Sequence, residues 1–245
     1  MNLKGKAVLI TGGARIGRAV AIALAERGAD VAMTYRQSKK SAEEAVKRAR
    51  DLGVRGLAVR ADLTNEADLG NAIKMVSRAF GGLDILVNMA SIYEKTALKK
   101  LDSKVWKKNM DANLKCAYLL SLKCAPIMKR RGGGRIIHFS DWVAASGRPR
   151  YKDYIPYYVS KAGVIGLTEA LALELAPDIL VNAIAPGPIL PPPDLSSAGK
   201  REVQRVTPLG RWGGPEEIAK AVLFLIETDF VTGECIRVDG GRHLY

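Results

Sequence analysis

Tyr157 and Lys161 are the first residues in this sequence whose types and spacing suit acid–base chemistry. They lie four residues apart in an expected helix over 157–175, so their side chains share one helix face. A free tyrosine, with a pKa of about 10, is poorly matched to proton transfer at neutral pH, and a neighbouring ammonium lowers that pKa. Taken alone, such a pair is usually a pair of surface side chains, so other motifs must support a catalytic role.

A glycine-rich loop supplies one of these motifs. Residues 10–17 read ITGGARIG and lie between the first expected strand and an alanine-rich helix. Glycine permits a positive φ and lets backbone amides approach a phosphate, while the helix N-terminus adds positive potential. An ordinary strand-to-helix turn is the alternative. The position of the loop at the start of an α/β chain favours dinucleotide binding.

The end of the second expected strand indicates which dinucleotide is bound. Sites for NAD place an acidic residue there to bind the ribose 2′-hydroxyl. Here Tyr35 takes that position, and Arg36 and Ser38 follow. Because a guanidinium and a hydroxyl bind a 2′-phosphate that a carboxylate would repel, the sequence favours NADP(H). The alternative is that Arg36 is only a solvated surface charge.

Strand-like and helix-like segments alternate along all 245 residues, which predicts parallel βαβ units. The apolar runs are continuous, as in strands that are covered on both faces. We therefore expect an α/β fold: a single domain over 1–245 with a Rossmann-like doubly wound parallel sheet of about seven strands in a three-layer α/β/α arrangement. Strands are expected at 6–10, 30–35, 56–60, 84–87, 135–139, 179–184 and 235–238, and helices at 16–27, 41–52, 66–80, 103–129, 157–175 and 215–227.

The net charge of +13 has two explanations, a nucleic-acid partner or an anionic cofactor. The basic residues have no aromatic or zinc-binding pattern among them, so we do not expect nucleic-acid binding. The 3 cysteines lack C-x-x-C spacing and predict buried free thiols in a reducing cytoplasm. We expect no signal peptide, no membrane span and no metal site.

In their order and spacing, these features resemble the short-chain dehydrogenase/reductase family over the whole chain. The family implies that Tyr157 gives a proton to the reduced centre, that Lys161 lowers the tyrosine pKa and holds the nicotinamide ribose, and that Asn113 anchors a water. It also implies a cytoplasmic homotetramer that acts on a small molecule. The resemblance places cofactor contacts at Gly12, Gly13, Arg15, Ile16, Arg36, Ser38, Asp62, Leu63, Asn88, Ala90, Tyr157, Lys161, Pro186, Gly187 and Ile189.

The sequence departs from the common family pattern in its glycine loop, after its fourth strand and at the catalytic serine. The loop is one residue short, with Arg15 at the middle glycine, and Ser91 replaces another glycine. Asp141 stands where the catalytic serine is expected, and a short insertion over 147–156 precedes the tyrosine. A shift in register would instead make Ser140 or Ser146 the catalytic hydroxyl.

These departures together resemble the pteridine-reductase branch, with the closest resemblance to dihydromonapterin reductases. The segments IIHFSD at 136–141 and DGGRHL at 239–244 support that resemblance. It implies that Tyr93 stacks on a pterin and that Asp141 and Tyr157 contact it. A carboxylate beside Tyr157 would disfavour the tyrosinate. The alternatives are a half-buried loop aromatic for Tyr93 and a helix N-cap or turn residue for Asp141.

The sequence thus favours an NADPH-dependent reductase that transfers hydride to a dihydropterin. One alternative is a general short-chain carbonyl reductase, for example one acting on a 3-oxoacyl thioester, and another is a non-catalytic NADP-binding protein. Asp141 and Tyr93 argue against the first alternative. The intact set of Tyr157, Lys161 and Asn113 argues against the second.

Overall fold

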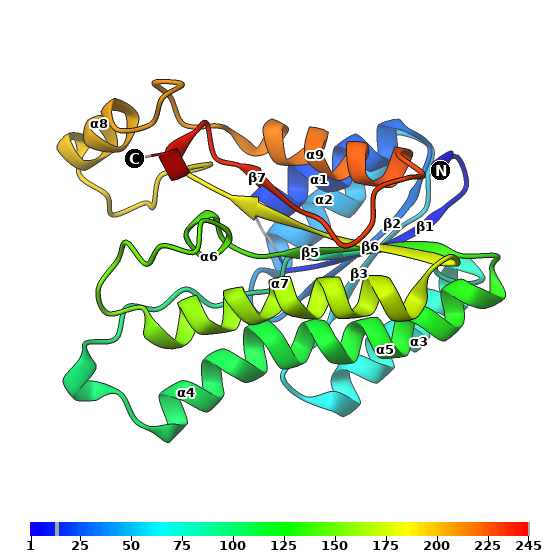
Figure 1. The fold of residues 1–245 in the computed structure, drawn as a ribbon. Helices are drawn as coiled ribbons and strands as arrows, with labels where there is room; N and C mark the ends of the chain where they lie inside the picture. Colours follow the sequence, from blue (N-terminus) through cyan, green and yellow to red (C-terminus); the bar gives the residue numbers. More distant parts are fainter. Residues whose placement is uncertain (13–14, 245) are drawn as a thin grey trace.

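The computed structural model describes residues 1–12 and 15–244, so Gly13, an expected cofactor contact, lies outside the described residues. Seven parallel strands form one sheet in the order β3-β2-β1-β4-β5-β6-β7 (Figure 1). This order confirms the expected doubly wound Rossmann-like sheet. The strands are β1 (Ala7–Thr11), β2 (Asp30–Tyr35), β3 (Gly56–Arg60), β4 (Ile85–Asn88), β5 (Gly134–Phe139), β6 (Ile179–Pro186) and β7 (Cys235–Val238).

Helices cover both faces of the sheet, which gives the expected three layers (Figure 1). One face carries α1 (Ile16–Glu26), α2 (Lys39–Asp51) and α9 (Pro215–Glu227), and the other carries α3 (Glu66–Phe80), α5 (Cys116–Arg130) and α7 (Ile155–Leu175). None of the helices within the described residues is long and apolar enough to cross a bilayer.

The side chains of β1 show why the sheet needs two helical layers. Val8 and Ile10 pack into the hydrophobic core that includes residues of α1, α2 and α9. Ala7 and Leu9 point the opposite way, into the core that includes residues of α3 and α5. All four side chains are fully buried. Successive residues of a strand face opposite sides, so an apolar run is stable only where both faces are covered.

The helix expected over 103–129 is interrupted in the structure. It consists of α4 (Ser103–Asn109), a π-helical turn, η2 (Met110–Lys115), and α5. Asn113 lies in that wide turn, and its side chain bonds both backbone groups of Ile92 in the loop after β4. The expected single helix was therefore wrong, because a long-range contact selects the local winding. Four short helices were not expected: η1 (Leu98–Lys100), α6 (Trp142–Ala145), α8 (Ser197–Arg205) and η3 (Arg242–Leu244).

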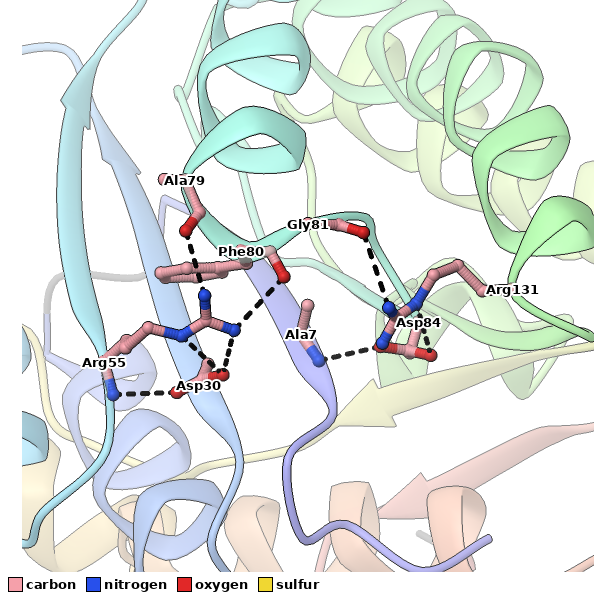
Figure 2. Close-up of polar contacts among 8 residues, drawn as sticks. All are labelled: Ala7, Asp30, Arg55, Ala79, Phe80, Gly81, Asp84 and Arg131. Atoms are coloured by element: carbon pink, nitrogen blue, oxygen red, sulfur yellow. Dashed lines mark hydrogen bonds and ion pairs between the residues drawn. The ribbon is translucent and has the colours of Figure 1, made fainter.

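At the amino edge of the sheet, Asp84 is fully buried and hydrogen-bonded on both carboxylate oxygens. Its Oδ2 accepts from the Ala7 backbone N–H at 2.9 Å and from Arg131 Nη2 at 3.0 Å (Figure 2). Its Oδ1 accepts from Lys6 Nζ at 3.2 Å. Burial raises the pKa of Asp84, but these bonds outweigh burial and hold the pKa below its ordinary value. The buried carboxylate therefore stays charged and ties β1 to the start of β4 and the end of α5.

A second carboxylate, that of Asp30, ties the start of β2 to the segment before β3. Asp30 accepts from the Arg55 backbone N–H at 2.7 Å and from Arg55 Nη2 at 2.6 Å, and the guanidinium lies 5.0 Å from the centroid of the Phe80 ring (Figure 2). Arg55 also donates to the carbonyls of Ala79 and Phe80 at the end of α3. Ion pairs thus hold together the segments at the amino edge of the sheet.

Candidate active site

The switch point of the sheet lies between β1 and β4, and the backbones that follow these two strands come very close together. Gly12 has φ of 63°, and a Cβ there would lie 2.8 Å from the Cα of Ala90. Only glycine fits that position. Asn88, expected to contact the cofactor, is buried and accepts a 2.6 Å hydrogen bond from the Thr11 hydroxyl. It therefore holds the ends of β1 and β4 together beneath the glycine loop.

A cavity of about 260 Å³ opens beside this crossing, at the ends of β2 and β3. Arg36 lies in its wall, 3.8 Å from Asp62. Hydrogen bonds from Thr64 and the charge of Arg36 outweigh burial and lower the pKa of Asp62, so the carboxylate is charged. The expected cofactor contacts that line this cavity are Gly12, Arg36, Ser38, Asp62, Leu63 and Ala90.

Two polar groups in this cavity are left for a ligand. The Ser38 hydroxyl makes no capping bond at the exposed start of α2 within the described structure. The Thr34 hydroxyl is buried and, as far as the described residues go, has no hydrogen-bond partner. With the close Gly12 crossing and the Arg36 cation, these groups suit the nucleoside half of a phosphorylated dinucleotide.

Near the end of β5 and the start of α7, the Tyr157 phenol donates a 2.9 Å hydrogen bond to Asp141 Oδ2. The other oxygen of Asp141 accepts from the Val143 backbone N–H at 2.8 Å, so the residue is also the N-cap of α6. The Ser140 hydroxyl instead donates to the backbone carbonyl of Lys161, and the Ser146 hydroxyl donates to that of Val143. Of these three candidates, Asp141 is the one bonded to the tyrosine.

Burial controls the electrostatics of this group. It raises the pKa of Asp141 and, with the neighbouring Asp141 charge, holds the pKa of Tyr157 well above its ordinary value. The pKa of Lys161 falls to about 8, again through burial. The tyrosine pKa is therefore raised overall, and the expected lowering by Lys161 stays a prediction. Lys161 Nζ donates to the Phe139 carbonyl at 2.7 Å and lies 5.8 Å from the Tyr157 ring centroid, whereas Asp141 contacts the phenol directly.

Asn113 joins the site to the loop after β4. Its Oδ1 accepts from the Ile92 backbone N–H at 2.8 Å, and its Nδ2 donates to the Ile92 carbonyl at 3.2 Å and to Ser160 Oγ at 2.9 Å. Ser160, which precedes the buried Lys161, was missed by the sequence reasoning. The expected water at Asn113 stays a prediction.

Several aromatic side chains pack beside the Tyr157 phenol. The Tyr93 ring stacks on Tyr154, with centroids 4.6 Å apart and planes at 16°, and meets Tyr157 edge-on at 4.8 Å. Tyr151 meets Trp142 edge-on at 6.0 Å. Tyr93 is 54% exposed and lines the cavity described next, so part of its side chain stays accessible beside its contacts with Tyr154 and Tyr157. Tyr151 and Tyr154 were missed by the sequence analysis, although the insertion over 147–156 that carries them was a usable signal.

A second cavity, of about 510 Å³, contains the reactive groups. Asp141, Tyr157, Tyr93 and Trp142 line it, and Lys161 and Asn113 are buried outside its lining. A side chain at position 187 would overlap Asp239, so the glycine there lets the backbone after β6 lie directly against Asp239. The expected cofactor contacts on this cavity are Arg15, Ile16, Pro186, Gly187 and Ile189. Within the described residues there is no cluster of three potential metal ligands.

A proton-donating tyrosine and a buried lysine at the carboxyl edge of a doubly wound sheet, beside a glycine loop, define a nicotinamide-dependent oxidoreductase. Residues 13–243 match the family described as Enoyl-(Acyl carrier protein) reductase. The chain belongs to the short-chain dehydrogenase/reductase family, as its sequence motifs suggested.

Similar proteins cover the whole chain. The 3-oxoacyl-[acyl-carrier-protein] reductase of Staphylococcus aureus is 38% identical, over 98% of each chain. That of Aquifex aeolicus is 36% identical, also over 98% of each chain. Among solved structures, a short-chain dehydrogenase/reductase from Serratia marcescens has a TM-score of 0.91 at 32% identity, covering 99% of this chain and 100% of its own. One from Burkholderia cenocepacia, in complex with NADP, has a TM-score of 0.90 at 33% identity, covering 99% of each chain.

These relatives correct one expectation. The sequence was expected to lie closest to the pteridine-reductase branch, but the curated relatives described above are named 3-oxoacyl-[acyl-carrier-protein] reductases. They support the general carbonyl-reductase alternative better than the pterin hypothesis.

Proposed function

We propose that this protein is an NADPH-dependent reductase of a small carbonyl compound, and that 3-oxoacyl thioesters are its best-supported substrate class. The observation that carries the proposal is the Tyr157 phenol, which stays protonated on the wall of a 510 Å³ cavity with Lys161 buried nearby. The names of the curated relatives support the thioester.

NADPH is the proposed reductant, and when bound it supplies the hydride. Arg36 and Ser38 would hold its 2′-phosphate, and the glycine loop with Arg15 would face its pyrophosphate. The NADP complex of the Burkholderia cenocepacia relative supports this assignment.

Tyr157 is the proposed proton donor to the substrate oxygen. In the structure the Tyr157 phenol donates its proton in a hydrogen bond to Asp141, with 2.9 Å between the two oxygens. The substrate oxygen must therefore replace Asp141 as the acceptor. The raised tyrosine pKa keeps that proton in place until hydride transfer makes the oxygen strongly basic. Lys161, whose pKa is about 8, can then stabilise the tyrosinate and share in its reprotonation.

A dihydropterin is the second candidate substrate, favoured by the carboxyl group of Asp141. Pterin reduction needs a proton on the ring nitrogen next to the carbon that receives hydride. Because burial raises the pKa of Asp141, this side chain can carry such a proton, which a serine could not supply as readily. The exposed face of Tyr93 offers a planar ring a surface for stacking.

NADPH oxidation with a substrate panel tests both candidates. The panel contains an acetoacetyl thioester, dihydrobiopterin, dihydromonapterin, dihydrofolate and a simple quinone. The wild-type protein is compared with Asp141→Ser, which keeps an N-cap side chain for α6. The thioester proposal requires the highest kcat/KM on the acetoacetyl thioester, and Asp141→Ser should retain or raise it.

The other outcomes assign the function differently. A higher kcat/KM on a pterin, lost in Asp141→Ser, would replace the thioester proposal by pterin reduction. NADPH binding without oxidation on any substrate would indicate a non-catalytic NADP-binding protein.

We also propose the homotetramer expected for the family. Apolar side chains of α4 and α5 support it: Trp106, Tyr118 and Leu122 are each more than 40% exposed. Light scattering at micromolar concentration tests this, and a monomeric mass would refute it.

A further inference from the structure

Arg242, near the C-terminal end of the chain, brings a positive charge to the wall of the 510 Å³ cavity that contains Asp141 and Tyr157. It begins η3, beside α8 at the carboxyl edge of the sheet (Figure 1). Its guanidinium lies 5.3 Å from the centroid of the Trp142 ring, and its Nη1 donates to the Val206 carbonyl at 3.2 Å. Arg242, Trp142, Asp141 and Tyr157 all line the 510 Å³ cavity.

Within residues 1–12 and 15–244, no carboxylate lies within ion-pair distance of this charge. Among the residues that the structure describes, Arg242 forms no ion pair. Asp239, three residues before it, accepts from the backbone N–H and the imidazole of His243, at 2.9 and 2.7 Å. Glu202 is paired with Arg205 at 2.7 Å. A guanidinium has five N–H donors, and within the described part of the chain Arg242 uses its side chain for one hydrogen bond, to the Val206 carbonyl.

The guanidinium is also held in place. Trp142 is only 4% exposed, so the ring under Arg242 is fixed in the core. An arginine on an aromatic ring loses less conformational freedom when it binds an anion than a free lysine would. Arg150 lies 5.7 Å from the same ring but does not line this cavity, and its Nη2 donates to the His243 carbonyl. The two arginines therefore share one ring, and of the two, Arg242 lines this cavity.

We propose that Arg242 is a specificity-determining residue that binds an anionic group, a phosphate or a carboxylate, on the part of the substrate remote from the reacting bond. The inference rests on the proposed reductase function and extends it to a charged substrate. A phosphopantetheine thioester would present a phosphate, and a glutamate-conjugated pterin would present carboxylates. A phosphate and a carboxylate each make charge-assisted, bidentate hydrogen bonds with a guanidinium.

Matched neutral and anionic substrates test the proposal and separate the two sources of charge. One pair is the acetoacetyl thioester of N-acetylcysteamine and that of 4′-phosphopantetheine, and the other is dihydrobiopterin and dihydrofolate. Arg242→Met removes the charge but keeps an apolar stem on Trp142. Arg150→Met is the control, because it removes the other cation from the same ring.

Arg242→Met should raise KM for the anionic member of the active pair by about tenfold or more and change the neutral member by less than about twofold. Arg150→Met should leave the anionic-to-neutral ratio of kcat/KM unchanged. An unchanged ratio in Arg242→Met, or an equal change in Arg150→Met, would overturn the proposal. Should Arg242→Met fail to fold, the wild-type ratio must still fall as salt is raised, and a salt-independent ratio overturns the proposal equally.

Calorimetry separates this inference from the proposed function. The probes are the 3-hydroxybutyryl thioesters of the same two carriers, titrated into protein saturated with NADPH, because no hydride can pass between a reduced product and a reduced cofactor. Tighter binding of the phosphorylated probe that depends on Arg242, without turnover of any substrate, would retain the anion site and refute the reductase. Turnover without preference for the anionic member would retain the reductase and refute the anion site.

Discussion

Asp141→Asn tests the coupling between the carboxylate and the proposed proton donor. Asparagine has nearly the same shape and is an equally good N-cap, so the bond to the Val143 N–H and the start of α6 should be kept. What is lost is the negative charge that accepts the Tyr157 proton at 2.9 Å. After burial, that charge and that hydrogen bond are the largest causes of the raised tyrosine pKa.

The size of the effect follows from the contact. A hydrogen bond to a charged group contributes about 1.5–3 kcal/mol, and one pKa unit corresponds to about 1.4 kcal/mol. The tyrosinate should therefore cost less to form in Asp141→Asn, and the pKa of Tyr157 should fall. The pKa of Lys161, about 8 in the wild type, should also fall because Asp141 favours its charged form. Both changes move the basic limb of the pH profile to lower pH.

The assay is kcat/KM for a simple ketone over the neutral to alkaline range, with tyrosinate absorbance as an independent titration. Ser146→Ala is the matched control, since Ser146 lies in the same turn and bonds the Val143 carbonyl rather than the phenol. Its basic limb should stay at the wild-type position. A basic limb that does not move in Asp141→Asn would refute the coupling and leave Asp141 as a helix cap only.

Tyr157→Phe should lower kcat by about 100-fold or more and leave NADPH affinity, measured by fluorescence titration, nearly unchanged; near-full activity would exclude the tyrosine mechanism. Arg36→Asp should raise KM for NADPH by about tenfold or more relative to KM for NADH, and equal effects would exclude the 2′-phosphate assignment. Asp84→Ala should lower the free energy of unfolding in urea by about 2–4 kcal/mol at neutral pH, because it leaves Arg131 and Lys6 without their buried partner. The folded-state pKa of Asp84 is lowered, so its contribution is complete above the ordinary aspartate pKa and is lost as pH falls through the folded value; an equal deficit at neutral and strongly acidic pH would contradict that role.

Much of the fold follows from local sequence patterns. The apolar runs and the glycine turns placed all seven strands within one or two residues of their observed ends, since a doubly covered strand must be apolar on both faces. The break between α4 and α5 could not be predicted in this way. It depends on Asn113, which bonds Ile92 in one loop and Ser160 in α7, and nothing in the helical periodicity over 103–129 records those partners.

The site shows the same division between local and long-range information. The spacing of Tyr157 and Lys161, and their relation to Asp141, pointed to three groups that the structure brings to one place. The spacing alone did not give the net direction of the tyrosine pKa, because that direction is set by burial and by Asp141, while the Lys161 ammonium donates to the Phe139 carbonyl. Tyr151 and Arg242 were missed, since an inserted segment and the C-terminal segment reach the cavity only in the folded protein.

Two buried carboxylates at the amino edge of the sheet differ from two polar groups at its carboxyl edge, and this difference separates stability from function. At the amino edge, Asp84 and Asp30 are buried and bonded to cations that no ligand needs to reach. At the carboxyl edge, the Thr34 hydroxyl lacks a partner and Arg242 lacks a counter-ion within the described residues. Unsatisfied buried polar groups and unpaired charges reduce stability unless a ligand completes them. Saturating NADPH should therefore raise the unfolding temperature of Asp84→Ala as much as that of the wild type, but raise that of Arg36→Asp much less. An equal rise in all three proteins would show that the carboxyl edge does not hold the cofactor through these groups.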